Sequence, residues 1–385
     1  MLTRRAVSVY LALGIGLDLC TVGRAAAHSM PPRVTQVITQ VPADTVVVTT
    51  RGILFGDPDA HRWSLLCSDA FGVAVGTPYR VARLPSGRLF VANLGGLRFS
   101  DDRGCSWRPH PQLGKRDITS LFQDPKSPSR LYVTVFGNDE GGIRRSEDGG
   151  ETFQVLYRAT DGEFLNSLLV APGYPQQIYA TLSTTDEVSQ LFVLRSGDGG
   201  ATWDRTELPP EADALDVSVL AVNPADPSEL LVRVRSFNSS DGDALLRSAD
   251  GGRTFTELGR YLSISDAAFS GDGATSFVVT VEGLWRASTP ERSFVRAGTS
   301  DRLTFVSVVD RALLVGGYYV ANDMLNVSVR ATDVSDPSAV LKRWMSFDEV
   351  SSAVTCAAPS TVNVDCALDW IDWSREFQPK TPASP

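Results

Sequence analysis

The sequence predicts an all-β fold, a seven-bladed β-propeller of four-stranded antiparallel blades. The first observation is a nine-residue motif that occurs four times, as FSDDRGCSW (99–107), RSEDGGETF (145–153), RSGDGGATW (195–203) and RSADGGRTF (247–255). The second is the spacing, because the aromatic residues that close the four copies are 46, 50 and 52 residues apart. Repeats of roughly 40–50 residues built from short strands are typical of propeller blades. The third is that no long stretch shows helical periodicity.

Each position of the motif suits a tight β-hairpin turn. A glycine such as Gly150 can adopt the positive φ that these turns need, and the closing aromatic, such as Phe153, begins the next strand with a large apolar surface. The serine and aspartate side chains can accept hydrogen bonds from nearby backbone N–H groups and so hold the turn. We expect a structural role for these residues, which are Ser100, Asp102, Ser146, Asp148, Ser196, Asp198, Ser248 and Asp250.

Weaker copies of the repeat extend the pattern in both directions. They close on Trp63, Phe294 and Trp344, at steps of 44, 39 and 50 residues from their neighbours, which makes seven repeats. Within the third repeat, four strand-like segments follow one another at 118–123, 130–136, 142–146 and 152–157. The propeller is therefore expected within 28–347, and an eighth, incomplete blade remains an alternative.

The two ends of the chain differ from the repeats. Residues 1–27 contain Arg4 and Arg5, then a mostly apolar segment, and end in three consecutive alanines. This is typical of a signal peptide cleaved near Ala27, so we expect a secreted or periplasmic protein. The export route is the general secretory one or the twin-arginine one, whose signal Thr3-Arg4-Arg5 faintly resembles. No later stretch has the ~18 apolar residues of a membrane span. The tail at 348–377 could supply a ring-closing outer strand or a disulfide-pinned hairpin, and residues 378–385 are expected to be disordered.

Four cysteines follow the predicted signal peptide: Cys67, Cys105, Cys356 and Cys366. In an exported protein an even number of cysteines indicates disulfides, here with three possible connectivities. We expect Cys67 to pair with Cys105, from neighbouring blades, and Cys356 with Cys366, across a short hairpin. Because no C-x-x-C pair occurs and the three histidines are scattered, we expect no metal and no cofactor.

Composition narrows the class of partner. The chain has 385 residues, of which 43% are hydrophobic and 21% charged, with a formal net charge of −9. This negative charge argues against nucleic acid or an anionic membrane surface as the partner, because both attract a basic face. We expect a monomer.

The motif resembles the Asp-box, or BNR repeat, of sialidases, xyloglucan-cleaving glycosidases, sortilin-like receptors and the photosystem II assembly factor. The resemblance implies that the Asp-box motifs support the fold and lie away from the face that carries the active or binding site. Sialidases carry a Tyr/Phe-Arg-Ile-Pro motif whose arginine binds the substrate carboxylate, and Tyr79-Arg80-Val81-Ala82 is similar. Ala82 stands where that motif has proline. Sialidases also need two further arginines, a tyrosine nucleophile with a glutamate base, and an aspartate acid, and no local motif in this sequence identifies these residues.

Topology indicates another candidate surface. Loops that join the second and third strands of each blade emerge opposite the motif turns, and loops on a rigid scaffold often carry binding residues. Here they are acidic, with Asp139, Glu140, Asp186, Glu187, Asp241, Asp243 and Asp323. We therefore expect an exported, non-catalytic scaffold that binds a protein or glycan. The alternative is a sialidase-like glycoside hydrolase, which would need arginine, tyrosine and carboxylate groups converging at the central axis.

Overall fold

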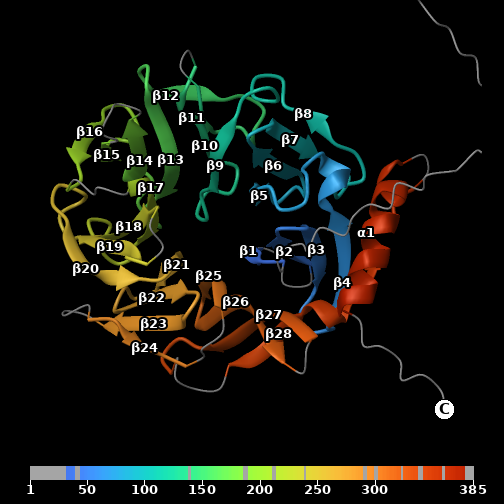
Figure 1. The fold of residues 1–385 in the computed structure, drawn as a ribbon. Coiled ribbons are helices and arrows are strands. Elements are labelled where there is room, and N and C mark those ends of the chain that lie inside the picture. Colours follow the sequence, from blue (N-terminus) through green and yellow to red (C-terminus); the bar gives the residue numbers. More distant parts are fainter. Residues whose placement is uncertain are drawn as a thin grey trace, which may run out of the picture. The chain divides into compact units, whose positions relative to one another are not determined.

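The protein is described here by a computed structural model, in which seven sheets surround a central axis (Figure 1). The seven-bladed propeller is confirmed. The predicted signal peptide at 1–27 and the end at 378–385 lie outside the described residues. The structure describes residues 32–39, 44–137, 140–184, 190–209, 214–237, 240–288, 293–298, 302–321, 324–336, 341–357 and 360–377.

Each blade contains four antiparallel strands in chain order, and its first strand lies nearest the axis. The strands of blades one to three are β1 (Val34–Ile38), β2 (Thr45–Thr49), β3 (Gly52–Asp57), β4 (Arg62–Cys67); β5 (Arg80–Arg83), β6 (Leu89–Asn93), β7 (Gly96–Ser100), β8 (Arg108–Pro109); and β9 (Ile118–Gln123), β10 (Leu131–Val135), β11 (Gly142–Ser146), β12 (Gln154–Arg158). Those of blades four and five are β13 (Glu163–Val170), β14 (Ile178–Thr184), β15 (Leu191–Ser196), β16 (Asp204–Glu207); and β17 (Ala214–Val222), β18 (Leu230–Ser236), β19 (Asp243–Ser248), β20 (Thr256–Tyr261). Those of blades six and seven are β21 (Ile264–Phe269), β22 (Thr275–Thr280), β23 (Gly283–Ser288), β24 (Val295–Arg296); and β25 (Arg302–Val309), β26 (Ala312–Ala321), β27 (Met324–Asp333), β28 (Lys342–Ser346).

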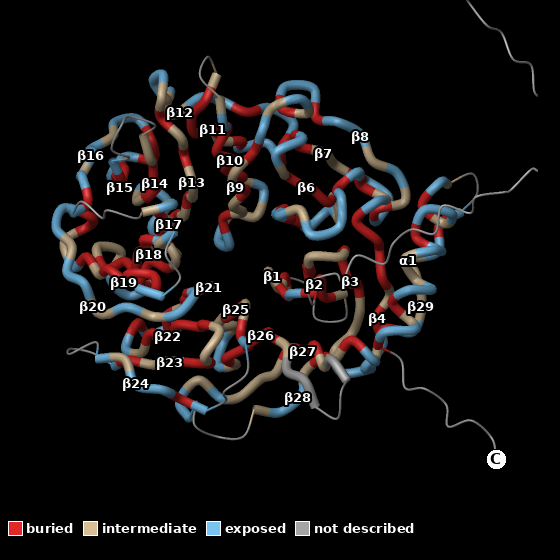
Figure 2. Tube along the Cα trace, in the orientation of Figure 1, coloured by how far each residue is buried: buried red, intermediate tan, exposed pale blue. Residues whose placement is uncertain are grey.

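The core lies between adjacent blades. The second strands are continuous apolar runs, such as TVVVT in β2, because both faces of each sheet are covered by neighbouring sheets. Val193 of blade four, for example, packs with Val219 and Val232 of blade five in one buried cluster. Outer strands such as β12 are largely exposed or half-buried, so burial decreases from the middle of each blade to the rim (Figure 2).

Hydrogen bonds between side chains and backbone groups join the inner parts of the blades all round the ring. These bonds satisfy backbone groups at the inner edges, which have no neighbouring strand towards the axis. In order around the ring they are Gln36 Nε2 to Val81 O (2.9 Å), Gln123 Nε2 to Arg83 O (2.7 Å), Thr119 Oγ1 to Leu165 O (2.8 Å), Thr181 Oγ1 to Val217 O (2.9 Å), Arg233 Nη1 to Ile264 O (2.8 Å), Val306 N to Asp266 Oδ2 (3.1 Å) and Thr304 Oγ1 to Val34 O (2.9 Å).

The C-terminal tail crosses the outer edge of blade one. After the short 3-10 helix at Phe347–Glu349, strand β29 (Val350–Ala353) pairs parallel with β4 as a fifth strand. The expected hairpin does not form, because residues Val362–Phe377 form helix α1. The buried residues of α1, Val362, Cys366, Trp373 and Phe377, recur at helical spacing and face the propeller, and this signal was missed in the sequence.

The predicted cysteine pairs are wrong. The disulfides are Cys67–Cys366 and Cys105–Cys356, with sequence separations of 299 and 251 residues. The expectation relied on proximity along the chain, whereas the tail brings α1 against the end of β4 and Cys356 against the motif turn of blade two. Two disulfides fit an extracellular or periplasmic protein. No helix within the described ranges is long and apolar enough to cross a membrane.

Candidate functional site

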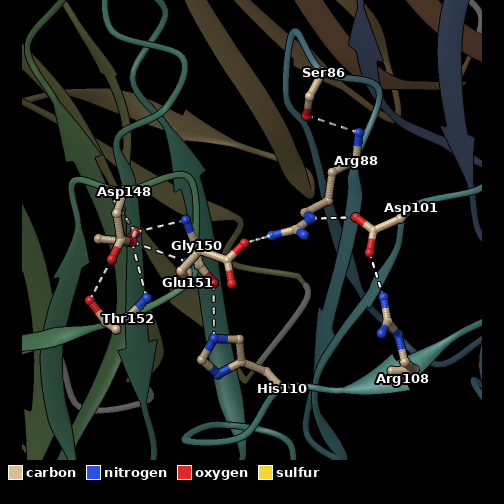
Figure 3. Close-up of polar contacts among 10 residues, drawn as sticks. Ser86, Arg88, Asp101, Arg108, His110, Asp148, Gly150, Glu151 and Thr152 are labelled. Atoms are coloured by element: carbon tan, nitrogen blue, oxygen red, sulfur yellow. Dashed lines mark hydrogen bonds and ion pairs between the residues drawn. The ribbon is translucent and has the colours of Figure 1, made fainter.

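The four motif turns use their polar groups internally. In blade three, Ser146 Oγ donates to Asp148 Oδ1 (2.7 Å) and accepts from Gly150 N (2.8 Å). Thr152 donates to the two oxygens of Asp148, from N to Oδ1 (3.0 Å) and from Oγ1 to Oδ2 (2.6 Å) (Figure 3). The same contacts recur around Ser100 and Asp102, Ser196 and Asp198, and Ser248 and Asp250.

These contacts favour the ionised aspartates. Burial alone would raise the pKa of Asp148, but the hydrogen bonds from Thr152, Ser146 and Glu151 lower it to about 2. At Asp198 the hydrogen bond from the Thr202 hydroxyl is the main cause, and the pKa is again lowered to about 2. A carboxylate whose two oxygens already accept several hydrogen bonds has little capacity left for a ligand.

A polar network also holds the motif turn of blade three against blade two (Figure 3). Arg88 forms ion pairs with Asp101 in its own blade and with Glu151 in the next. His110 Nε2 lies 2.9 Å from Gly150 O, and Gln112 N donates to Nδ1 (3.2 Å), so the ring is the neutral tautomer protonated at Nε2. Burial lowers the pKa of His110, which agrees with the neutral form. Sequence reasoning did not identify this network, because its contacts between the two blades join residues that are 63 and 40 positions apart.

The acidic loop residues do not form one open surface in the described part of the chain. Asp139, Asp186, Glu187 and Asp323 lie outside the described residues. Glu140 pairs with Arg116 (2.6 Å) and Arg144 (3.4 Å), while Asp241 is exposed.

Asp243 differs from the expectation of a solvent-facing loop residue. It is only 6% exposed, and its carboxylate accepts from Ile264 N (2.8 Å) and Ser236 N (3.3 Å). Burial raises the pKa of this side chain. Asp243 therefore lies at the joint between blades five and six, where a partner cannot contact it directly.

Arg80 marks the mouth of the axial channel. It is the first residue of β5, an innermost strand, at the face from which the loops joining second and third strands emerge. Its side chain is exposed, and no described residue forms a hydrogen bond or ion pair with the guanidinium. Burial by the surrounding protein nevertheless lowers the pKa of Arg80. The guanidinium is therefore available for a ligand.

Charged groups from blades five and six lie near Arg80. Asp266 of β21 accepts from Val306 N (3.1 Å) and Ala267 N (2.9 Å), and burial raises the pKa of Asp266 to about 6. The charges of Arg80 and Arg233 partly oppose this rise. Arg233 itself contacts Asp216 (3.4 Å) and the Ile264 carbonyl (2.8 Å). The channel mouth therefore combines a guanidinium without a partner among the described residues, a carboxyl group whose pKa is raised by burial, and a paired arginine.

Tyr79, which precedes Arg80, does not take part in this group. Its hydroxyl donates to Thr49 O (2.6 Å), and burial raises the pKa of Tyr79. It is therefore unsuited to act as a nucleophile beside Arg80. The sequence motif identified Arg80, but Asp266 and Arg233 come from distant repeats and had no local signal.

Comparisons with known proteins agree with the fold. The family model of sortilin, described as Sortilin, neurotensin receptor 3, matches residues 141–311. A xyloglucanase of Hypocrea jecorina (strain QM6a) is 32% identical over 117 residues, which are 30% of this chain and 13% of the xyloglucanase. The matched stretch is thus a small part of that enzyme's length.

Solved propeller structures are similar at low sequence identity. An ancestral GH74 enzyme matches with a TM-score of 0.48 and 15% identity, over 69% of this chain and 38% of that chain. YCF48 bound to D1 peptide matches with a TM-score of 0.42 and 11% identity, over 69% of this chain and 85% of that chain. The chain is a seven-bladed β-propeller, and residues 141–311 of it are similar to the sortilin family.

Proposed function

We propose that the protein is an exported, non-catalytic β-propeller that binds a protein or glycan partner. Its contact surface is the face that carries the loops between second and third strands, with the channel mouth at its centre. The observation that carries this proposal is Arg80, an exposed guanidinium without a hydrogen-bonding partner among the described residues, at the end of a rigid inner strand. Arginine in such a position can bind a carboxylate or another polar acceptor of a partner.

The face that carries the motif turns also supports the loop face as the contact surface. There, the aspartates of the four motif turns are occupied by hydrogen bonds within each turn. The two disulfides support export, because such bonds persist in oxidising compartments. On the loop face, the exposed groups among the described residues include Asp241 and Arg80.

Partner capture tests the proposed contact face. The mature protein is expected to capture a partner from the native envelope fraction or bind on a glycan array, and binding should weaken as salt rises towards about 1 M. The triple variant Asp139→Lys, Asp186→Lys, Asp241→Lys and the single variant Arg80→Gln should each lose capture without a lower melting temperature. Lys126→Gln is the control, because this exposed residue lies in the β9–β10 turn on the motif face.

The control makes the outcome specific. Normal capture by both loop-face variants would contradict the proposed surface, and so would loss of capture in Lys126→Gln. A lower melting temperature in the loop-face variants would instead show that these residues support the fold.

A second candidate is a glycoside hydrolase, and one observation favours it. Asp266 lies near Arg80, and burial raises its pKa to about 6. Glycosidases use a carboxylic acid with a raised pKa together with a second carboxylate. The nearby Asp216, however, is held by Arg233 and Arg235. Hydrolysis assays distinguish this candidate from the binding scaffold.

A further inference from the structure

A separate cavity lies on the motif-turn face, between blades one and two. Its volume is about 540 Å³, within the range of small-molecule sites. Four chain segments line it: the end of β3 with the start of β4, the motif turn of blade two, the tail after β29, and Asp44 just before β2. The Cys105–Cys356 disulfide joins the second and third of these walls. The cavity is therefore built by the oxidised protein, and it is distinct from the channel mouth on the opposite face.

Some charged groups of the cavity are already paired. Asp44 forms ion pairs with Arg83 and with Arg103 (2.8 Å). Asp102 accepts from Ser100 Oγ (2.7 Å) and from Ser106 N and Oγ (2.8 and 2.6 Å). These contacts leave the two carboxylates little capacity for a ligand, and they fix the shape of the wall.

Three other lining groups are available. Arg62 is exposed, and no described residue forms a hydrogen bond or ion pair with its guanidinium. Asp57 accepts through Oδ1 from Asp59 N (2.9 Å), and its Oδ2 has no partner among the described residues. Thr355 is exposed, and its hydroxyl likewise has no hydrogen-bonding partner among the described residues. The cavity thus offers one cation, one carboxylate acceptor and one hydroxyl.

We propose that this cavity binds a uronic acid residue. The ligand carboxylate pairs with Arg62, and ligand hydroxyls donate to Asp57 Oδ2 and exchange a hydrogen bond with Thr355. The carboxylates of Asp44, Asp57 and Asp102 disfavour a multiply charged anion such as phosphate, because only one unpaired guanidinium opposes them. An apolar ligand would leave Asp57 and Arg62 without partners and is disfavoured for that reason.

Ligand titration of the intact, oxidised protein by NMR or calorimetry tests this proposal. The probes are D-glucuronate, D-glucose and acetate. D-Glucuronate is expected to bind saturably with a Kd on the order of 1 mM, and D-glucose and acetate at least about tenfold more weakly. Arg62→Gln should weaken D-glucuronate binding by about tenfold or more, since it removes the only unpaired charge-assisted contact. Thr355→Val should weaken it by a smaller factor.

The matched control is Arg158→Gln, which removes an exposed arginine without described partners from the outer strand of blade three. It should bind D-glucuronate like the wild type, and neither arginine variant should change the melting temperature. Equal binding of acetate and D-glucuronate, or of D-glucose and D-glucuronate, would overturn the proposal. So would the lack of saturable D-glucuronate binding, or unchanged binding by Arg62→Gln. None of these outcomes depends on partner capture at the loop face.

Discussion

Replacing Cys105 and Cys356 together by serine is expected to lower the free energy of unfolding by about 2–5 kcal/mol. The disulfide joins residues 251 positions apart, and it anchors the tail from blade seven to the motif turn of blade two across blade one. Without it, β29 and α1 would be held by Cys67–Cys366 and by packing alone. Chemical denaturation under non-reducing conditions measures the loss.

The pairing itself is checked by peptide mapping without reduction. Fragments linked as Cys67–Cys366 and Cys105–Cys356 are expected. A Cys67–Cys105 link, or an unfolding midpoint of the double variant equal to that of the wild type, would show that the tail does not close the ring in this way. Replacing Cys67 and Cys366 by serine should also destabilise the fold, because that bond ties α1 to the end of β4.

Changing Asp148, Asp198 and Asp250 to alanine is expected to lower the melting temperature by several degrees for each substitution. Each change removes acceptors used by a backbone N–H and a hydroxyl in the same turn. The effects should add, because the three turns belong to different blades. Differential scanning calorimetry measures them.

The pH dependence of this destabilisation has a defined sign. The pKa of Asp148 and that of Asp198 are lowered from 3.8 to about 2, so their stabilising effect is present above pH 3.8 and lost as the pH falls through about 2. The difference between wild type and variant should shrink in that window. Asp161→Ala, at an exposed turn residue in the same part of the propeller, is the control and should melt like the wild type. Motif variants that melt normally but lose partner capture would argue for a binding role of the turns.

The blades could be predicted because their signals are local. Ser146, Asp148, Gly150 and Phe153 lie within a single turn, and their spacing repeats along the chain. Arg80 also had a local signal, because Tyr79-Arg80-Val81-Ala82 is similar to a sialidase motif. The acidic loops could be located, but burial of Asp243 depends on Ile264 of the next blade.

Features that depend on distant contacts could not be derived in the same way. The disulfide partners are separated by 299 and 251 residues. The buried residues Val362, Cys366, Trp373 and Phe377 follow a helical pattern, but the short separation of Cys356 and Cys366 suggested a hairpin instead. Trp373 and Phe377 are buried against Phe347, with ring centroids at 4.6 and 5.4 Å. This packing is what favours the helix.

A hydrolysis assay tests the central claim, a binding scaffold rather than an enzyme, most directly. The purified oxidised protein is incubated with a sialoside, xyloglucan and a β-glucan near pH 6, where Asp266 titrates. The proposed function predicts no product above the buffer control, both for the wild type and for Asp266→Asn. Turnover of any of these substrates at an enzyme-like rate, abolished in Asp266→Asn while the melting temperature is unchanged, would contradict it and assign the channel mouth to a glycoside hydrolase.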